Sequence, residues 1–127
     1  MARFVLVHGA CHGGWCWRDL RPALAARGHI VEALDLPSVS TDPATLTEAT
    51  LEADARAVAD ALTAPTLLVG HSAAGFSISR AAQLAPTHVT ALIYLCAYVP
   101  QPDTSIRDLA RDAPGQPLAG QLEVDRA

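Results

Sequence analysis

The sequence has no long apolar run. The apolar residues near its start, Phe4–Val7, are followed at once by His8 and Gly9, so this run is too short for a membrane span or for the apolar region of a secretion signal. A short apolar run that stops at a glycine-containing loop is typical of a buried strand. We therefore expect no membrane partner and a cytoplasmic location.

Cysteine is scarce, with only Cys11, Cys16 and Cys96 in the chain. An odd number of cysteines without a secretion signal argues against a disulfide framework. Two histidines, His8 and His12, crowd the same segment as Cys11 and Cys16, but their spacing matches none of the common zinc patterns. We expect no metal, and we interpret the segment as small residues packed in a tight loop.

The chain also has no surplus of positive charge and no internal repeat. Its formal net charge is -4, so no basic surface is expected for nucleic acid or anionic lipid. No similarity at a period of about 20–50 residues suggests a repeat array. Half of the 127 residues are hydrophobic and 17% are charged, which is a globular composition. A small organic molecule is the expected partner.

What the sequence does contain is an alternation of short apolar strands with helical segments. The predicted strands are Phe4–Val7, His29–Leu34, Thr66–Val69 and Val89–Leu95, and the predicted helices cover Trp15–Arg27, Leu51–Leu62 and the segment from Ser72 to about Leu84. Strands separated by helices require crossovers, which predicts an α/β fold: a doubly wound, mostly parallel sheet with helices on both faces. The expected strand order is second, first, third, fourth.

Residues 1–100 are expected to form this α/β core. Gly28 stands where a helix C-cap glycine belongs, and Ser38–Thr47 is rich in turn-forming residues and predicts a loop. After residue 100 the sequence becomes polar and rich in proline. We expect residues 101–127 to be an irregular tail or the start of a cap or lid, with a short helix near Ile106–Arg111.

The segment 70–75 reads GHSAAG and lies between a predicted apolar strand and a predicted helix. This is the setting of a nucleophile elbow, in which the chain turns so sharply that only small residues fit two positions before and after the serine. Gly70 and Ala74 meet that need, although the usual motif has glycine in place of Ala74. The alternative is that Ser72 is only a helix N-cap; the complete motif favours the elbow.

Two loops are expected to complete one site. Ser72 and the Ala73 N–H lie at the start of a helix, where an oxyanion is stabilised. The glycine-rich loop His8–Trp15 can point backbone N–H groups inward, and we assign the second oxyanion donor to Ala10. Both loops flank the position where the winding of the sheet reverses, which is where ligands bind in such sheets.

The stretch FVLVHGACHGGWCW at residues 4–17, with Gly70-His71-Ser72 downstream, closely resembles the plant methylesterase and hydroxynitrile lyase family and its bacterial relatives, which are α/β-hydrolases. The resemblance extends to about Pro100. It implies Ser72 as nucleophile, Ala10 and Ala73 N–H groups as the oxyanion hole, small carboxylic esters with an apolar or aromatic acyl part, and no cofactor. Hydroxynitrile lyases of this family carry threonine where this chain has Gly9, which favours ester hydrolysis.

A serine hydrolase also needs an acid and a histidine, in the chain order Ser, Asp/Glu, His. The family places both downstream, after a helical cap and two further strands. His29 and His88 begin predicted strands and so belong to the opposite edge of the sheet. His71 is expected to be held in the elbow and to point away from the serine. Asp103 follows the fourth strand on the correct side and is a weak candidate for the acid.

His8 and His12 are the histidines near the expected site. We interpret them, with Gly9 and His71, as residues that shape the oxyanion loop, and a role for His8 or His12 as general base is the alternative. The predicted fourth strand is apolar on both faces, as in the interior of a sheet. We therefore expect it to pair with a second copy of the chain or with a missing C-terminal portion.

Three functions follow from these observations. The first is a serine carboxylesterase of which this chain is the N-terminal portion. The second is a hydroxynitrile lyase or another relative that does not hydrolyse esters, which Gly9 disfavours. The third is a catalytically incomplete domain that only binds a small molecule, and it is favoured if the chain is complete, because loss of the base costs such triads about a million-fold in turnover.

Overall fold

The structure is a computed structural model, and it describes residues 1–115. Four strands form one sheet, and they are β1 Arg3–Val7, β2 Ile30–Leu34, β3 Thr66–His71 and β4 Val89–Leu95. The helices of the described residues are α1 Leu20–Ala25, α2 Pro43–Thr47, α3 Leu51–Asp60, α4 Ala74–Leu84 and α5 Ile106–Asp112, and the single-turn 3-10 helices are η1 Gly14–Trp17, η2 Pro37–Val39 and η3 Pro86–His88.

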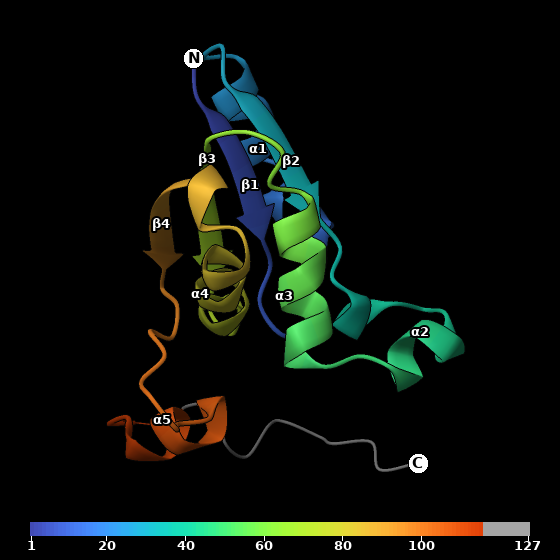
Figure 1. Cartoon of the computed structure of the whole chain (residues 1–127), viewed down its shortest axis with the longest axis vertical. Helices are drawn as coiled ribbons and strands as arrows, with labels where there is room; N and C mark the ends of the chain where they lie inside the picture. The colour runs from blue at the N-terminus through green and yellow to red at the C-terminus, as the bar shows by residue number, and fades with distance from the viewer. Residues whose placement is uncertain (116–127) are drawn as a thin grey trace.

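The sheet has the predicted order, β2-β1-β3-β4, and its neighbouring strands are parallel. Val7, the last residue of β1, is paired with Leu34 on one side and with Gly70 on the other. The carboxyl ends of the strands consequently meet at one end of the sheet, where the arrowheads lie in Figure 1. The α/β class and the expected reversal of winding between β1 and β3 are confirmed.

Helices cover both faces of the sheet, as predicted (Figure 1). On one face Val5 and Leu68 pack with Ile78 of α4, and all three side chains are fully buried. On the other face Leu6 and Val69 pack with Trp17 of η1. Full burial of one such aliphatic side chain stabilises the fold by about 1.5–3 kcal/mol, so these residues fix the strands that carry the site.

The prediction of a helix over residues 15–27 is wrong in its first half. The chain instead forms the 3-10 turn η1 and then the short helix α1. Pro22 explains the break, because a helix that began at Trp15 would bring proline into its interior, whereas in α1 it lies in the first turn. The C-cap of α1 is Ala26, so the prediction that Gly28 is the C-cap is wrong. Gly28 lies two residues later, where it ends the following turn with a φ of +81° and donates its N–H to the Ala25 carbonyl at 2.9 Å.

The prediction of a loop over Ser38–Thr47 is also wrong in part, because this segment contains the end of η2 and all of α2. The Asp42 carboxylate accepts hydrogen bonds from the N–H groups of Ala44 and Thr45 at 3.3 Å each, and Pro43 occupies the first helical position. Both are start signals for a helix. Turn-forming residues here cap a helix rather than replace it.

The short helix expected near residue 106 is confirmed as α5. Its first turn is closed by a capping box, in which Ser105 and Asp108 each accept a hydrogen bond from the backbone of the other. The helix lies beyond the carboxyl ends of the strands (Figure 1), and Ile106 reaches the cavity described below. The expectation of an irregular tail or the start of a cap or lid over residues 101–127 stays a prediction, and its part at 116–127 lies outside the described residues.

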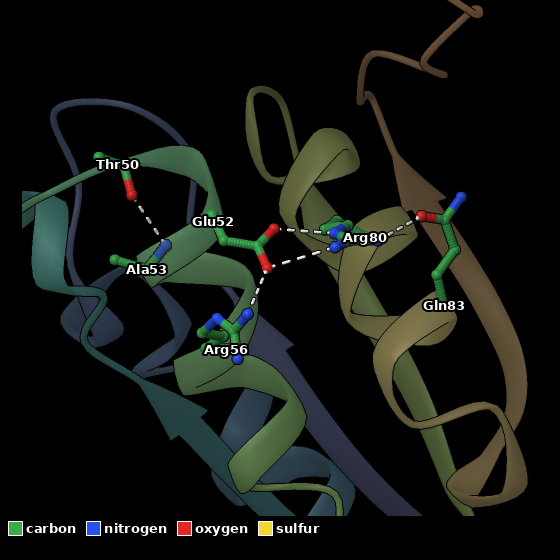
Figure 2. Close-up of polar contacts among 6 residues, drawn as sticks. All are labelled: Thr50, Glu52, Ala53, Arg56, Arg80 and Gln83. Carbon is green, nitrogen blue, oxygen red and sulfur yellow. Dashed lines mark hydrogen bonds and ion pairs between the residues drawn. The ribbon is translucent and has the colours of Figure 1, made fainter.

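Helices α3 and α4 are joined by an ionic network as well as by apolar contacts. Arg80 donates from Nε and Nη2 to the two carboxylate oxygens of Glu52 at 2.8 and 3.3 Å. Arg56, one turn further along α3, lies 3.0 Å from the same carboxylate, and Arg80 also donates to Gln83 at 3.1 Å. Figure 2 shows Glu52 between the two arginines. The network links the two helices that line the cavity.

Within the described residues β4 is an edge strand. Its Leu92 and Tyr94 side chains pack on the core, whereas Ile93 and Leu95 are 39% and 43% exposed on the other face. The expected pairing of this strand with another chain stays a prediction. No helix within residues 1–115 has the length and apolar composition needed to cross a bilayer.

Candidate active site

Ser72 occupies a sharp turn between β3 and α4. Its φ of +55° lies in the left-handed region, which non-glycine residues rarely adopt and which is common at functional sites. The Ser72 carbonyl accepts hydrogen bonds from the N–H groups of Gly75 at 3.2 Å and Tyr98 at 3.0 Å, and these bonds hold the turn. The N-cap of α4 is Ala73, and the Ser72 hydroxyl makes no capping hydrogen bond within residues 1–115.

The turn depends on a small residue before the serine. A Cβ atom on Gly70 would lie 2.9 Å from Ile78 Cδ1 and 3.1 Å from the Ala74 carbonyl oxygen. Such contacts are too close for carbon, so the strand and the helix approach each other only because residue 70 is glycine. This is the geometry expected of segment 70–75.

The loop that follows β1 touches the serine turn. A Cβ atom on Gly9 would lie 2.9 Å from Ser72 Cβ and 3.0 Å from the His71 carbonyl oxygen. The pairing of Val7 with Gly70 explains the contact, because two further residues along each strand bring Gly9 beside Ser72. The two loops predicted to form one site are therefore adjacent.

A cavity of about 280 Å³ opens beside these loops. Ala10 and Ala73, the two predicted oxyanion donors, both contribute to its wall; Ser72 does not, although its neighbours do. The lining residues come from the two loops, from η2, α3, α4 and α5 and from their flanks, and they are His8, Gly9, Ala10, Leu36, Ser38, Ala49, Thr50, Leu51, Asp54, Ala73, Ala74, Ser77 and Ile106. The wall is mainly apolar, which suits an organic ligand.

His8 is buried, with 1% of its surface exposed, and both of its ring nitrogens are engaged. Nδ1 donates to the Gly9 carbonyl at 2.8 Å, and Nε2 accepts from the Leu36 N–H at 3.1 Å. Because a carbonyl only accepts and an N–H only donates, the ring carries its proton on Nδ1. Its Nε2 lone pair is occupied, so His8 ties the loop to the segment after β2.

His12 and His71 belong to a small aromatic group on the other side of the loop. His12 Nδ1 donates to the Ala10 carbonyl at 2.9 Å, and its ring stacks on Trp15 with centroids 5.3 Å apart. The His71 ring makes edge contacts with His12 at 6.1 Å and with Trp17 at 6.4 Å. Both histidines thus support the backbone that carries Ala10 and Ser72.

None of the remaining candidates is hydrogen-bonded to Ser72 within residues 1–115. Asp103 is exposed, has a φ of +57° and forms no hydrogen bond or ion pair with residues 1–115. His29 accepts the Ala2 N–H at 3.2 Å beside the amino end of β1, and His88 ends η3 before β4. Over the described part of the chain, no three metal-ligating side chains come together.

Sequence reasoning missed two buried polar residues of the cavity wall. Asp54 is 7% exposed and accepts the Ser38 N–H at 3.0 Å, and Ser77 is 3% exposed. A signal for Asp54 was present, because it lies four residues before Val58, on the buried face of α3. No comparable pattern marks Ser77, since a serine within a helix is common on any face.

Comparisons with known proteins agree with this geometry. Residues 4–126 match the alpha/beta hydrolase family. The chain is 41% identical over 103 residues to salicylic acid-binding protein 2 from Nicotiana tabacum, an alignment that covers 76% of this chain and 40% of the tobacco protein. Esterase PIR7B from Oryza sativa subsp. japonica is 39% identical over 104 residues, with 76% of this chain and 39% of the rice protein covered.

A similar solved structure is that of a pyrethroid hydrolase from Sphingobium faniae, with a TM-score of 0.75, 37% identity, and coverage of 91% of this chain and 47% of that chain. The chain thus spans less than half the length of these relatives. The family match extends over nearly all of the sequence, and the elbow, the glycine loop and the parallel sheet are consistent with it. This chain belongs to the alpha/beta hydrolase family.

Proposed function

We propose that the chain provides the nucleophile half of a serine carboxylesterase that acts on small apolar or aromatic esters. The observation that carries the proposal is the juxtaposition of Gly9 with Ser72, with Ala10 and Ala73 on the wall of one cavity. Two backbone donors beside a strained serine turn are the arrangement that acyl transfer requires.

In this reaction Ser72 Oγ attacks the ester carbonyl carbon, and the carbonyl oxygen becomes an oxyanion. The N–H groups of Ala10 and Ala73 stabilise that charge, together with the amino end of α4. The C–O bond to the alcohol then breaks, the alcohol leaves with a proton, and water hydrolyses the acyl-serine. The Ser72 proton needs a base, and no histidine nitrogen within residues 1–115 is hydrogen-bonded to Ser72.

Two observations support ester hydrolysis over a hydroxynitrile lyase activity. The rice relative is named an esterase, and the Sphingobium relative is named a pyrethroid hydrolase. In addition, a side chain in place of Gly9 would meet Ser72 Cβ and the His71 carbonyl, so the threonine expected of a lyase does not fit this loop without a shift.

Covalent labelling tests the proposal without requiring turnover. The full chain is incubated with a fluorophosphonate probe, and p-nitrophenyl acetate hydrolysis is followed in parallel. We expect slow labelling of Ser72, because no histidine of residues 1–115 is bonded to it, and this labelling should be absent in Ser72→Ala. It should be retained in Ser79→Ala, which changes a serine of α4 that does not line the cavity. A folded chain that remains unlabelled at Ser72 would contradict the proposal and leave a domain that only binds small molecules.

A further inference from the structure

The cavity beside the serine turn has mostly apolar walls, but it also contains buried polar groups. Asp54 of α3 and Ser77 of α4 both line it, and they are 7% and 3% exposed. Buried polar groups are normally hydrogen-bonded, and a buried carboxylate is costly unless donors surround it. The hydrogen bonds of each polar lining residue therefore indicate what the cavity can bind.

Most of the polar lining groups have partners already. Both ring nitrogens of His8 are engaged, and the Thr50 hydroxyl accepts the Ala53 N–H at 3.0 Å as the N-cap of α3. Ser38 is exposed to solvent and donates its backbone N–H to Asp54 Oδ1 at 3.0 Å. Two acceptors remain, Asp54 Oδ2 and Ser77 Oγ.

Neither of these two oxygens makes a hydrogen bond within residues 1–115. Two other side-chain atoms of the described residues, Arg3 Nε and Trp17 Nε1, also lack a hydrogen-bond partner. Unlike the oxygens of Asp54 and Ser77, these two nitrogens are completely buried. The carboxylate of Asp54 and the hydroxyl of Ser77 are thus buried from bulk solvent, open to the cavity and short of one donor each. A ligand that donates a hydrogen bond inside the cavity would supply a donor that the described residues lack.

We propose that Asp54 and Ser77 form a subsite for a hydroxyl or amino group of the ligand. This inference rests on the proposed function: the ester carbonyl is held by Ala10 and Ala73, and the donor group lies on the part of the ester that enters the cavity. The preferred substrates are therefore esters that carry a neutral or cationic hydrogen-bond donor. A carboxylate in the same place is repelled by Asp54.

Equilibrium binding to the full chain tests this subsite. Acetophenone is a ketone that resembles an aromatic ester but cannot be hydrolysed, and its 3- and 4-hydroxy derivatives are compared with the matching methoxy derivatives by NMR titration. We expect at least one hydroxy compound to bind about tenfold more tightly than its methoxy counterpart, as a hydrogen bond to a buried charged group implies.

Three variants locate the effect. Asp54→Asn keeps an oxygen for the Ser38 N–H but loses the charge, and Ser77→Ala removes the hydroxyl from the interior of a helix that tolerates alanine. Each should reduce the hydroxy preference to about twofold or less. Asp60→Asn removes a charge from the exposed end of the same helix and should leave the preference unchanged. If one cavity variant fails to fold, the other still decides the question.

The inference is overturned if the hydroxy compounds bind no better than the methoxy compounds, if they do not bind, or if the preference survives in both cavity variants. Its failure is distinguishable from failure of the proposed esterase activity. Labelling of Ser72 without a donor preference rejects the subsite alone, whereas a donor preference lost in Asp54→Asn without labelling of Ser72 rejects the esterase activity alone.

Discussion

The backbone of Tyr98 lies directly against Gly75, so that a Cβ atom on Gly75 would overlap the Tyr98 carbonyl. The Tyr98 N–H at the same time donates to the Ser72 carbonyl at 3.0 Å. The segment that leaves β4 is therefore docked on the first turn of α4. Gly75 serves this close approach, which is a different need from the sharp turn that the serine motif itself imposes.

Gly75→Ala should consequently destabilise the protein by about 3 kcal/mol or more, because the added methyl group forces the two backbone segments apart. Gly28→Ala is the matched control: Gly28 has a φ of +81° but no atom within 4 Å of a Cβ, so only the left-handed conformation, at about 1–2 kcal/mol, opposes alanine. Urea denaturation followed by circular dichroism measures both. Equal losses would show that the contact with Tyr98 is unimportant.

Gly9→Ala tests the contact between the two loops of the site. The methyl group would lie 2.9 Å from Ser72 Cβ, which should shift the serine and reduce its fluorophosphonate labelling by at least about tenfold, since small misplacements of reacting groups are costly. Gly28→Ala, far from the serine turn, should label at the unmodified rate. Labelling of Gly9→Ala at that rate would mean that the loop is not part of the site.

The Glu52–Arg80 pair predicts a pH-dependent stability. The Arg80 guanidinium, helped by Arg56, holds the pKa of Glu52 below its ordinary value near 4.5. A carboxyl whose pKa is lowered by folding stabilises the protein above its unfolded pKa, and this stabilisation is lost as the pH falls through the folded pKa. Glu52→Gln should therefore be less stable than the unmodified protein at neutral pH and equally stable in strong acid.

Thermal unfolding of Glu52→Gln across this pH range measures the effect, with Asp60→Asn as a control that removes one acidic charge from the same helix without removing an ion pair of the described residues. High salt should reduce the difference at neutral pH, because the pair is exposed and screened. A difference that is constant with pH would contradict the assigned cause.

The cysteines should differ in reactivity. Burial raises the pKa of the Cys16 thiol, and the negative charge of Asp35 adds to the effect, whereas Cys11 and Cys96 are exposed. Because the thiolate is the reactive form, iodoacetamide at mildly alkaline pH should modify Cys11 and Cys96 before Cys16. Peptide mass spectrometry identifies the order, and the difference should vanish in denaturant. A Cys16 modified as fast in the folded chain would refute the prediction.

The exposed side chains of β4 predict self-association. Ile93 and Leu95 stand on an edge strand of the described sheet, and an apolar edge favours pairing with another chain. Ile93→Lys should raise the monomer fraction measured by size-exclusion chromatography with light scattering. Ile30→Lys, in the opposite edge strand β2, is the control. Ile30 is 46% exposed, but it is the one exposed residue of its strand, so β2 has no exposed apolar pair like Ile93 and Leu95. If the unmodified chain is entirely monomeric, the expected self-association through β4 is contradicted.

Much of the fold could be predicted because it follows from local patterns. Apolar runs that stop at glycine gave β1 and β3, since parallel strands covered on both faces leave no polar position. The helices at Trp15–Arg27 and Pro43–Thr47 were harder, because proline in a first turn both starts a helix and resembles a loop signal. The first was predicted too long, and the second was predicted as a loop.

The segment 70–75 determines by itself that a tight turn forms at Ser72, because the need for a small residue at Gly70 is local and steric, whereas the need for glycine at position 9 comes from its contact with Ser72. Only the tertiary structure decided what stands beside those loops. Asp54 and Ser77 come from two helices that pack against each other on one face of the sheet, and the length and tilt of the intervening segments determine that both face one cavity. The reason is physical: a backbone turn is specified by its own residues, whereas the neighbours of a buried side chain are fixed by how whole elements pack.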